Sequence, residues 1–532
     1  MIQTELRLPL SYTEADIERA LRASLPLSDE PIFEIKKLRR ILKGGGAEPR
    51  YFALRVAFSV SAEKEAGLLK MKKKVSPYEK PYLSVPKIEI ERSPVVVGMG
   101  PAGLFAALIL AEAGAKPILL ERGQPVEQRK RDVDAFFAGG ALSSESNIQF
   151  GEGGAGAFSD GKLKFGTKDA AIERVLETLV ACGAPEDILY KESPHVGTDL
   201  LCDAVRRIRE RLLSLGAQVH YGARMVGFSV SGGKICCVEY VQDGKPHRIE
   251  TNTVFLATGH SARDVFHLLY EKGARLEAKG FGIGMRVEHP REYMNALVYP
   301  DREEREMLGA ASYHLVTHLE NGRSVYSFCM CPGGTVVAAA SEAEGVCTNG
   351  MSEHARDAEN SNSALLVSLT PADFPSAHPL AGLALQEALE RAAFLAGGGD
   401  HRAPAIRMQD FLEKSETLSL GAVRPSYPRG VRLVSPDAYL PSYITESLRA
   451  GILDFEAWMP GFIYPDAVLT GVEARSTSPV RVLRAECGEA YAIGGLYPCG
   501  EGAGYAGGIV SSAADGVRIA MKFIQNVNKD IQ

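Results

Sequence analysis

The stretch PVVVGMGPAGLFAALILAEAGAKPILLER, residues 94–122, decides the fold of this chain. It opens with the apolar run Val95–Val97, which predicts a buried parallel strand. Three glycines follow at once in the spacing G-x-G-x-x-G: Gly98, Gly100 and Gly103. A small-residue helix, a second expected strand at 117–120 and the acid Glu121 complete the pattern. This order of strand, turn, helix and strand predicts a dinucleotide-binding unit.

Each residue of the turn has a physical role in holding a dinucleotide. Gly98 allows the tight turn, and Gly100 lets a pyrophosphate approach the backbone because it has no Cβ. Gly103 lets the helix pack closely on the strand. Pro101 and Ala102 begin the helix, whose amide groups and dipole face the anion.

The end of the second strand bears on which dinucleotide is bound. Glu121 is expected to accept hydrogen bonds from both hydroxyls of an adenosine ribose, and Arg122 beside it belongs to the same expected site. An acid at this position suits an unphosphorylated ribose, so NADP is disfavoured here. FAD and NAD both remain open on these residues alone.

Length and composition indicate a soluble globular protein of two or three domains. A chain of 532 residues is too long for one compact core. No apolar run approaches the roughly 18 residues that a membrane-spanning helix needs, and the first residues lack a signal pattern. Nine scattered cysteines do not form a disulfide framework. We therefore expect a cytoplasmic protein without a membrane partner.

Charge is distributed unevenly along the chain. The net charge is −6, yet residues 36–90 carry fourteen Lys and Arg against five Glu. A solvated basic face is one interpretation, and a surface that meets nucleic acid or another polyanion is the alternative. No stacking aromatic residues interrupt the basic residues at a recognisable spacing, so we do not expect a nucleic-acid partner.

Residues 1–90 are expected to form a small separate α+β domain followed by a linker. The pattern predicts a capping box at Ser11 and Glu14, and a strand-helix-strand-strand order suggests a ferredoxin-like arrangement. The expected segments are a strand at 2–8, a helix at 14–23, strands at 33–42 and 51–60 around a flexible turn at 43–49, and a Lys-rich linker at 70–92.

A glycine-rich segment at 147–163 has the most unusual local composition in the chain. Glycine loses more entropy on ordering than other residues, so such a run is expected where backbone passes close to something flat or charged. We expect a loop that cradles the cofactor; a loose surface loop is the alternative. The residues expected to contact the cofactor are Gly153, Gly154, Gly156 and Lys162.

The dinucleotide-binding domain is expected to be split in sequence. Its first part is assigned to 91–274, an inserted α+β substrate or cap domain to 275–465, and its second part to 466–532. The first part ends in a strand running into Ala257, Thr258 and Gly259, and the second contains Gly500, Glu501, Gly507, Gly508 and Ile509. No second fingerprint preceded by a strand exists, which indicates a single such domain.

The three motifs, in this order, resemble FAD proteins of the glutathione-reductase-like superfamily. The runs at 149–156, 328–334 and 500–508 also look like those of a bacterial group of uncharacterised FAD-dependent dehydrogenases, or NAD(P)/FAD-dependent oxidoreductases, with an N-terminal extension. The resemblance covers nearly the whole chain. It implies an α/β fold with a single Rossmann-type FAD-binding domain, and FAD as the cofactor.

The resemblance also implies roles for residues near the end of the chain. Glu501 stands where many superfamily members have an Asp that contacts the ribityl chain. Gly507, Gly508 and Ile509 would lie beside the pyrimidine end of the flavin, where a helix dipole stabilises a reduced, anionic ring. A dedicated NAD(P)H domain is not expected, so NAD(P)H would act only as a transient donor.

Six residues are candidates for the chemistry. His260 follows the Ala-Thr-Gly run, so it should lie near the cofactor. A strand end carries an Arg-Glu-His group that could bind a carboxylate and relay a proton, although the Arg and Glu could simply pair with each other. Two thiols on one strand face could form a redox pair, or could be small buried apolar groups. These candidates are Arg286, Glu288, His289, Cys329 and Cys331.

Taken together, the sequence predicts an FAD-dependent oxidoreductase that binds FAD noncovalently and acts on a small organic molecule. Hydride would pass between the flavin and this substrate. Two alternatives remain open: a flavin monooxygenase, and a redox sensor that binds RNA or another polyanion through its basic N-terminal domain. No metal site is expected, since His314 and His318 have no acid or Cys ligand at metal spacing.

Overall fold

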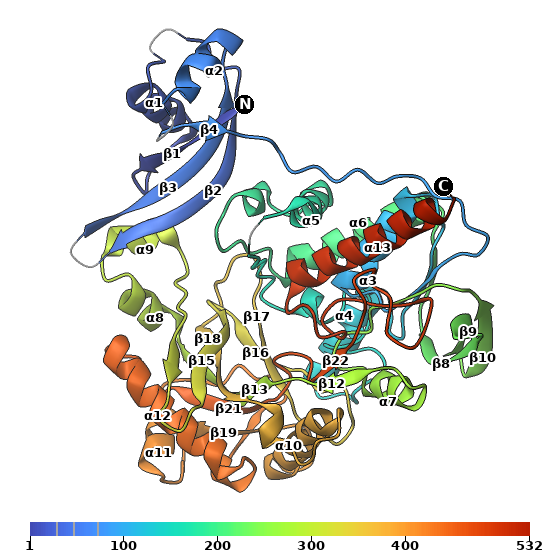
Figure 1. The fold of residues 1–532 in the computed structure, drawn as a ribbon. Coiled ribbons are helices and arrows are strands. Elements are labelled where there is room, and N and C mark those ends of the chain that lie inside the picture. The colour runs from blue at the N-terminus through green and yellow to red at the C-terminus, as the bar shows by residue number, and fades with distance from the viewer. Residues whose placement is uncertain (28–29, 46–47, 72–73, 167, 532) are drawn as a thin grey trace.

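The computed structural model describes residues 1–27, 30–45, 48–71, 74–166 and 168–531. Figure 1 shows a small N-terminal unit at the upper left, a domain built on a parallel sheet at the right, and an inserted domain at the bottom. An extended segment leads from the N-terminal unit to the parallel sheet. The expected turn and linker include residues 46–47 and 72–73, which lie outside the described residues.

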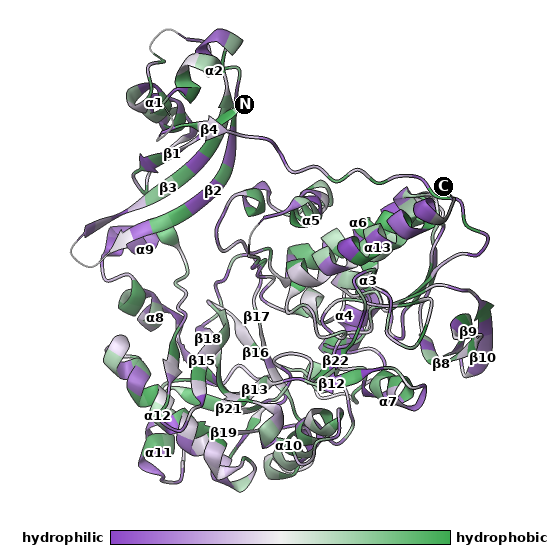
Figure 2. Ribbon diagram, viewed as in Figure 1, coloured by the Kyte–Doolittle hydropathy of each residue, from purple (hydrophilic) through white to green (hydrophobic). Residues whose placement is uncertain are grey.

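The N-terminal unit is a four-stranded antiparallel sheet with two helices on one face. Its strand order β2-β3-β1-β4 and its element order βαββαβ are those of a ferredoxin-like unit. Figure 2 shows apolar and polar residues alternating along β2 and β3, as expected for strands with one covered face. The elements are β1 (Ile2–Leu8), α1 (Glu14–Ser24), β2 (Glu34–Gly45), β3 (Glu48–Ser59), α2 (Ala62–Leu69) and β4 (Ser76–Pro77).

Helix α1 is capped by a different pair of residues from the pair that the pattern predicts. The backbone N and the Oγ1 of Thr13 both donate to Asp16 Oδ2 at 2.8 Å. The expected box at Ser11 and Glu14 is therefore wrong by two residues. Thr13 has an extended backbone immediately before the first helical residue, which is the geometry an N-cap requires.

The N-terminal unit contacts both other parts of the molecule through basic residues. Arg40 N donates to Tyr190 O at 2.7 Å, and Glu192 N donates to Arg40 O at 3.2 Å. At the far end of the same sheet, Arg50 forms an ion pair with Glu304. Part of the basic surface between residues 36 and 90 is thus used within the chain itself.

The parallel-sheet domain has five strands in the order β23-β11-β5-β6-β7. All neighbouring strands in it are parallel, and the three strands β23, β11 and β5 are buried along their whole length, whereas the edge strand β7 is not. Strand β23 comes from the end of the chain and lies beside β11, which completes the sheet across the insertion. The strands are β5 (Val95–Val97), β6 (Ile118–Leu120), β7 (Gln218–His220), β11 (Val254–Leu256) and β23 (Leu496–Pro498).

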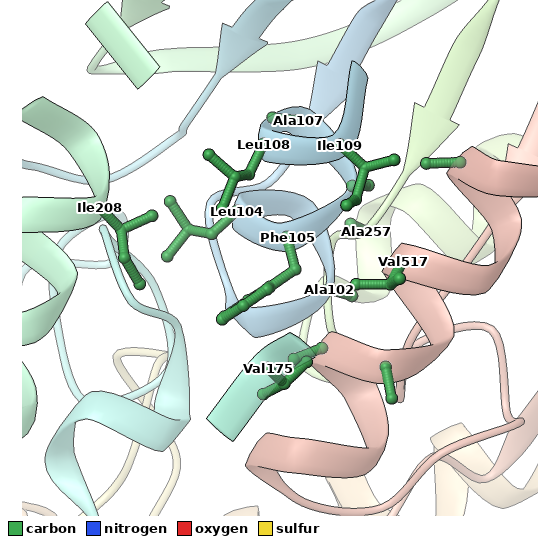
Figure 3. Close-up of a cluster of buried hydrophobic side chains, with 14 of the residues drawn as sticks. Ala102, Leu104, Phe105, Ala107, Leu108, Ile109, Val175, Ile208, Ala257 and Val517 are labelled. Carbon is green, nitrogen blue, oxygen red and sulfur yellow. The ribbon is translucent and has the colours of Figure 1, made fainter. Parts of the chain in front are cut away.

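Helices α3 (Pro101–Glu112) and α13 (Ile509–Ile531) pack side by side although they come from distant parts of the chain (Figure 1). Helix α3 is buried along most of its length and is apolar all round, so neighbours cover it on every side. Figure 3 shows Leu104 and Leu108 directed toward Ile208, and Ala102 beside Val517. This packing fixes the first turn of α3 relative to α13.

Further elements surround the parallel sheet. A three-stranded antiparallel sheet, order β10-β9-β8, lies at one edge of the domain. The helices are α4 (Val126–Phe137), α5 (Ala170–Ala181), α6 (Thr198–Ser214) and α7 (Arg263–Glu271). The strands are β8 (Ala223–Ser231), β9 (Lys234–Gln242), β10 (Lys245–Glu250), and the pair β12 (Leu276–Ala278) and β22 (Val480–Val482).

The inserted domain is built on a seven-stranded sheet in the order β14-β15-β18-β13-β21-β19-β20. Its strands are β13 (Phe281–Pro290), β14 (Val316–His318), β15 (Ser324–Cys331), β18 (Asn360–Leu369), β19 (Ala403–Arg407), β20 (Val431–Leu433) and β21 (Val468–Glu473). The hairpin of β16 (Thr335–Ala338) and β17 (Thr348–Met351) contacts this sheet. The helices are α8 (Arg291–Val298), α9 (Arg302–Leu308), α10 (Ala381–Gly397), α11 (Met408–Glu413) and α12 (Ser442–Trp458).

The inserted domain ends later in the sequence than residue 465. Strand β21 pairs with β13 and β19, so residues 468–473 belong to the inserted sheet and not to the second part of the dinucleotide-binding domain. Strand β21 is buried along its whole length. The sequence pattern could not assign it to the inserted domain, because buried strands of both domains are similar apolar runs.

None of the helices in the described part of the chain combines the length and the apolar character that crossing a bilayer requires.

Candidate functional site

A cavity of about 590 Å³ lies between the parallel sheet and the inserted sheet. Its walls come from segments that are far apart in the sequence. They include the turn before α3, the glycine-rich loop, the Ala257-Thr-Gly run, the N-terminus of α13, and strands β15 and β17. Its volume lies within the usual range of cofactor and ligand pockets.

The turn before α3 requires glycine at two positions. Gly98 has a φ of +96°, and a Cβ there would lie 2.5 Å from the carbonyl oxygen of Ala257. At Gly103 a Cβ would collide with the carbonyl oxygen of Gly98, so the helix reaches the strand only without a side chain. Gly103 therefore has a packing role and is not among the residues that line the cavity.

The backbone around Gly100 is open toward the cavity, so a pyrophosphate group has room to approach it. A Cβ at Gly100 would meet only Gly154 Cα, at 3.7 Å, and Pro101 and Ala102 line the cavity beside it. The N-terminus of α3 therefore points its unpaired amide groups into the cavity, as pyrophosphate binding requires. The residues present fit a dinucleotide such as FAD.

Arg129 holds the glycine-rich loop in place, a role that no sequence pattern predicts. It is fully buried on α4, and its guanidinium donates to five backbone carbonyl groups of the loop at 2.7–3.3 Å. Burial lowers its pKa to about 10. The carbonyl groups belong to Asn147, Ile148, Gly151, Glu152 and Gly154. A single basic residue in a polar helix carries no pattern that predicts such contacts.

The glycine-rich segment is thus an ordered loop and not a loose one. Gly154 and Gly156 line the cavity. Gly153 does not line it; its N donates to Met99 O at 2.8 Å, which ties the loop to the turn before α3. Lys162 lines the cavity as well, with Nζ 3.9 Å from Asp160 Oδ2.

Glu121 has a role beyond the one that the fingerprint predicts. Its carboxylate accepts hydrogen bonds from three backbone amides, those of Met99 at 2.8 Å, Gly123 at 2.9 Å and Gly151 at 3.0 Å. It therefore joins the fingerprint turn to the glycine-rich loop. Glu121 also lines the cavity, and Oε2 accepts only one of the three amides, so this oxygen keeps acceptor capacity for a ribose hydroxyl.

Arg122 lines the same end of the cavity. It donates to Glu145 at 2.6 Å and to Asp264 at 3.0 Å, and its guanidinium lies 4.2 Å from the ring centroid of Phe150. These contacts fix its side chain across the cavity wall.

The opposite end of the cavity is formed by the second part of the parallel-sheet domain. Ala257, Thr258 and Gly259 line it from one side. Glu501, Gly507, Gly508 and Ile509 line it from the other, at the start of α13. Gly500 lies behind this wall; its N donates to Asp515 Oδ2 at 2.8 Å, and it is not among the lining residues.

His260 lines the cavity next to these residues. Burial lowers the pKa of His260, and the positive charges of Arg475 and Arg263 lower it as well. Glu390 acts in the opposite direction, and the resulting pKa is about 4. The imidazole is therefore neutral at physiological pH and offers one donor and one acceptor.

Arg286 is fully buried and all of its donors are engaged. Nε and Nη2 donate to the carboxylate of Glu473 at 2.9 and 2.6 Å, and Nη1 donates to Asn362 Oδ1 and to Cys329 O. The geometry does not support the expectation that Arg286 binds a substrate carboxylate or pairs with its neighbour on the strand. It holds the cavity wall, because Glu473 and Cys329 both line the cavity.

Glu288 and His289 are placed away from the cavity. Glu288 accepts hydrogen bonds from Ser426 Oγ at 2.5 Å and Asn360 Nδ2 at 3.1 Å, and His289 Nε2 lies 2.9 Å from Phe462 O. Neither is among the lining residues. The side chains of neighbouring strand residues point to opposite faces, so the predicted Arg-Glu-His group does not converge on one point.

Cys329 and Cys331 both line the cavity. A β-bulge between Phe328 and Cys331 interrupts the strand there, and Cys329 has a φ of +42°. Burial raises the pKa of Cys329, against the charges of Arg286 and Lys162. The thiol is therefore protonated at neutral pH in the FAD-free protein.

Cys329 is expected to react with iodoacetamide in the FAD-free protein, although its raised pKa leaves little thiolate and makes the reaction slow at neutral pH. It is the one cysteine of the nine that is exposed, and its exposure is to the cavity. Saturating FAD is expected to slow this labelling about tenfold or more, because it fills the space in front of the thiol. Peptide mass spectrometry measures both rates. Equal labelling of Cys329 with and without FAD would contradict this placement.

Comparison with known proteins identifies the family. The family model "FAD-dependent protein, C-terminal domain-like" matches residues 280–476, which coincides with the inserted domain. An uncharacterised protein of Clostridium beijerinckii is 46% identical over 438 residues, covering 82% of this chain and 81% of the relative. The chain therefore belongs to the family of FAD-dependent proteins that this model describes, as the resemblance of its motifs implied.

Several solved structures are similar at a lower level. A flavin-dependent brominase is 13% identical with a TM-score of 0.37, covering 82% of this chain and 79% of that one. A geranylgeranyl bacteriochlorophyll reductase-like protein of Thermoplasma acidophilum is 11% identical with a TM-score of 0.37, and the alignment covers 83% of each chain. TM-scores below 0.5 do not establish a shared fold or activity.

Proposed function

We propose that this flavoprotein oxidoreductase binds FAD noncovalently in the main cavity and transfers a hydride between the flavin and a small organic substrate. The observation that carries the proposal is the continuity of the cavity. The same space is lined at one end by the dinucleotide fingerprint and at the other by polar side chains of the inserted sheet. A cofactor held by the first set leaves the second set to contact a substrate.

The residues that would hold FAD follow from the two ends of the cavity. Gly98, Gly100 and the first turn of α3 would bind the pyrophosphate, and Glu121 the adenosine ribose. At the other end Thr258, Glu501 and the start of α13 would surround the flavin. When bound, the isoalloxazine supplies the hydride chemistry, and the protein supplies binding and orientation.

The inserted sheet contributes the groups that would face the substrate. Tyr313 and Ser327 from one part of the wall, and Asn349 from β17, are hydrogen-bonding side chains that line the cavity. Burial raises the pKa of Tyr313, so its phenol remains a donor. The carboxyl group of Glu501, with its pKa raised to about 7, is a group near the flavin end that can move a proton at neutral pH, whereas neutral His260 can donate or accept a hydrogen bond there.

An anaerobic titration with NADH and then NADPH, followed by flavin absorbance, tests this function. Bleaching by one nucleotide would make the protein a reductase with that donor. Bleaching by neither, together with full reduction by dithionite, would leave a dehydrogenase reduced by its own substrate. Oxygen consumption coupled to hydroxylation would support a flavin monooxygenase instead. A flavin that dithionite cannot reduce would contradict the proposal.

Glu501 is expected to make stability depend on pH in the FAD-free protein. Burial raises its pKa from 4.5 to about 7, against hydrogen bonds from Gly508 and Thr477 and the charge of Lys279. The folded state then binds more protons than the unfolded state between these two values. The stabilising contribution is fully present below about pH 4.5 and is lost as the pH rises from there through 7, a change of about 3 kcal/mol.

Urea unfolding of the wild type and Glu501→Gln between pH 5 and 8 measures this effect. The variant has no carboxyl group to titrate, so its stability is expected to fall less over this range. Parallel curves for the two proteins would show that Glu501 titrates in its usual range.

A further inference from the structure

A second, more open cavity of about 500 Å³ adjoins the main one at the start of α13. Lys164 and Gly507 line both cavities, so the two meet at the end where Glu501 and Gly508 would surround the flavin. The opening is thus next to the reacting end of the cofactor site.

The charged residues that line this second cavity are positive. Lys164 and Lys279 are the charged residues that line it, and no carboxylate of the described residues lies within 4.0 Å of either ammonium group. Lys279 Nζ donates to Thr477 Oγ1 at 3.2 Å. Burial lowers the pKa of Lys279, with Glu501 raising it and Arg481 lowering it. By contrast, Lys162 in the main cavity lies 3.9 Å from Asp160.

A third cation stands beside the cavity with a donor unused. Arg481 Nε is buried, and it has no hydrogen-bond partner among the described residues. The guanidinium of Arg481 lies 5.5 Å from the ring centroid of Tyr505, which lines the cavity. Tyr505 is 40% exposed and Phe165 lines the same space, so two aromatic rings accompany the cations.

We propose that this second cavity is an anion-binding subsite, with Lys279 and Lys164 as its cations. It would hold the carboxylate or phosphate group of the molecule that exchanges hydride in the main cavity. Cations without an acidic partner at a cavity mouth bind such groups through charge-assisted hydrogen bonds. This inference rests on the proposed function and names its substrate class: an anionic compound.

The position of helix α13 also favours an anion in the second cavity, although a helix N-terminus alone would not define a binding site. This helix of 23 residues begins at Ile509, two residues after the lining residue Gly507, and its N-terminal end favours negative charge. The two lysines and the N-terminal end of α13 therefore all favour an anion in the second cavity.

The test uses the FAD-loaded protein at constant ionic strength, with inorganic phosphate and acetate as probes. Each is added to the oxidised holoenzyme, and the change in flavin absorbance gives a half-saturation concentration. Lys279→Met is expected to raise this concentration about tenfold or more for the anion that binds, because it removes a charge-assisted hydrogen bond. Lys245→Met, at an exposed position on the β9–β10 hairpin, is the matched control and is expected to change nothing.

The outcomes separate the alternatives. A response to phosphate alone indicates a phosphorylated ligand such as a nucleotide donor, and a response to acetate alone indicates a carboxylate substrate. No saturable response, or equal responses in the wild type and Lys279→Met, would overturn the subsite. Weaker FAD binding in Lys279→Met without any anion effect would also overturn it, because the lysine would then contact FAD itself. Dithionite reduction of the same samples tests the proposed function separately.

Discussion

Replacing Glu121 with alanine is expected to abolish FAD binding and to lower the free energy of unfolding by about 3 kcal/mol or more. The carboxylate is buried and is the acceptor for the amides of Met99, Gly123 and Gly151. Each buried amide that loses its partner costs about 1 to 3 kcal/mol. The three amides belong to the fingerprint turn, the strand end and the glycine-rich loop, so the cofactor cradle loses its common support.

A fluorescence titration with FAD and a urea unfolding curve measure the two effects. Glu121→Gln keeps one carbonyl oxygen as an acceptor, so its loss of stability is expected to be smaller. Glu271→Ala removes an exposed acid from α7 and serves as the charge control. FAD affinity in Glu121→Ala within about twofold of the wild type would contradict the role assigned to this carboxylate.

Replacing Arg286 with methionine is expected to lower the free energy of unfolding by about 3 to 5 kcal/mol. The guanidinium is 0% exposed and its partner Glu473 is 5% exposed. Removal of one member of such a pair leaves an uncompensated buried charge. Replacing both residues, with Arg286→Met and Glu473→Leu together, is expected to recover much of this loss because no buried charge remains.

Urea unfolding of the two single variants and the double variant measures the coupling. Arg302→Met, at a position 84% exposed on α9, is the control and is expected to stay within about 0.5 kcal/mol of the wild type. Equal losses in Arg286→Met and Arg302→Met would show that the buried pair is not a main support of the inserted sheet.

The local features of the cofactor site were predictable from the sequence. The fingerprint turn, helix α3 and strand β6 follow one another within 30 residues, and each is specified by glycine placement or by an apolar run. The lining residues Gly98, Gly100 and Glu121 were found this way. A turn that requires a φ of +96° leaves a clear signal, because other residues adopt it only with strain.

The contacts made between distant segments were not predictable. Arg129 reaches a loop about twenty residues away in the sequence, and Arg286 pairs with Glu473 at a separation of 187 residues. Neither pair has a spacing that marks it, because the contact depends on how whole elements pack. The pattern did place Arg286 and Glu288 on a strand, but it could not show that neither of them lines the cavity.

For Cys329 and Cys331, the sequence predicts their place on a strand but not the local backbone conformation. Strand alternation predicts that Cys329 and Cys331 share one face of the strand, and both residues line the cavity. The bulge between Phe328 and Cys331 and the left-handed backbone at Cys329 have no sequence signal of their own.

A titration of the FAD-free protein with FAD shows whether the main cavity binds the cofactor. Flavin fluorescence and absorbance give the stoichiometry, and denaturation followed by filtration shows whether the cofactor is released. The account predicts saturable binding of one FAD per chain, with all of the flavin released on unfolding. Absence of saturable binding, or flavin that stays with the unfolded chain, would contradict it.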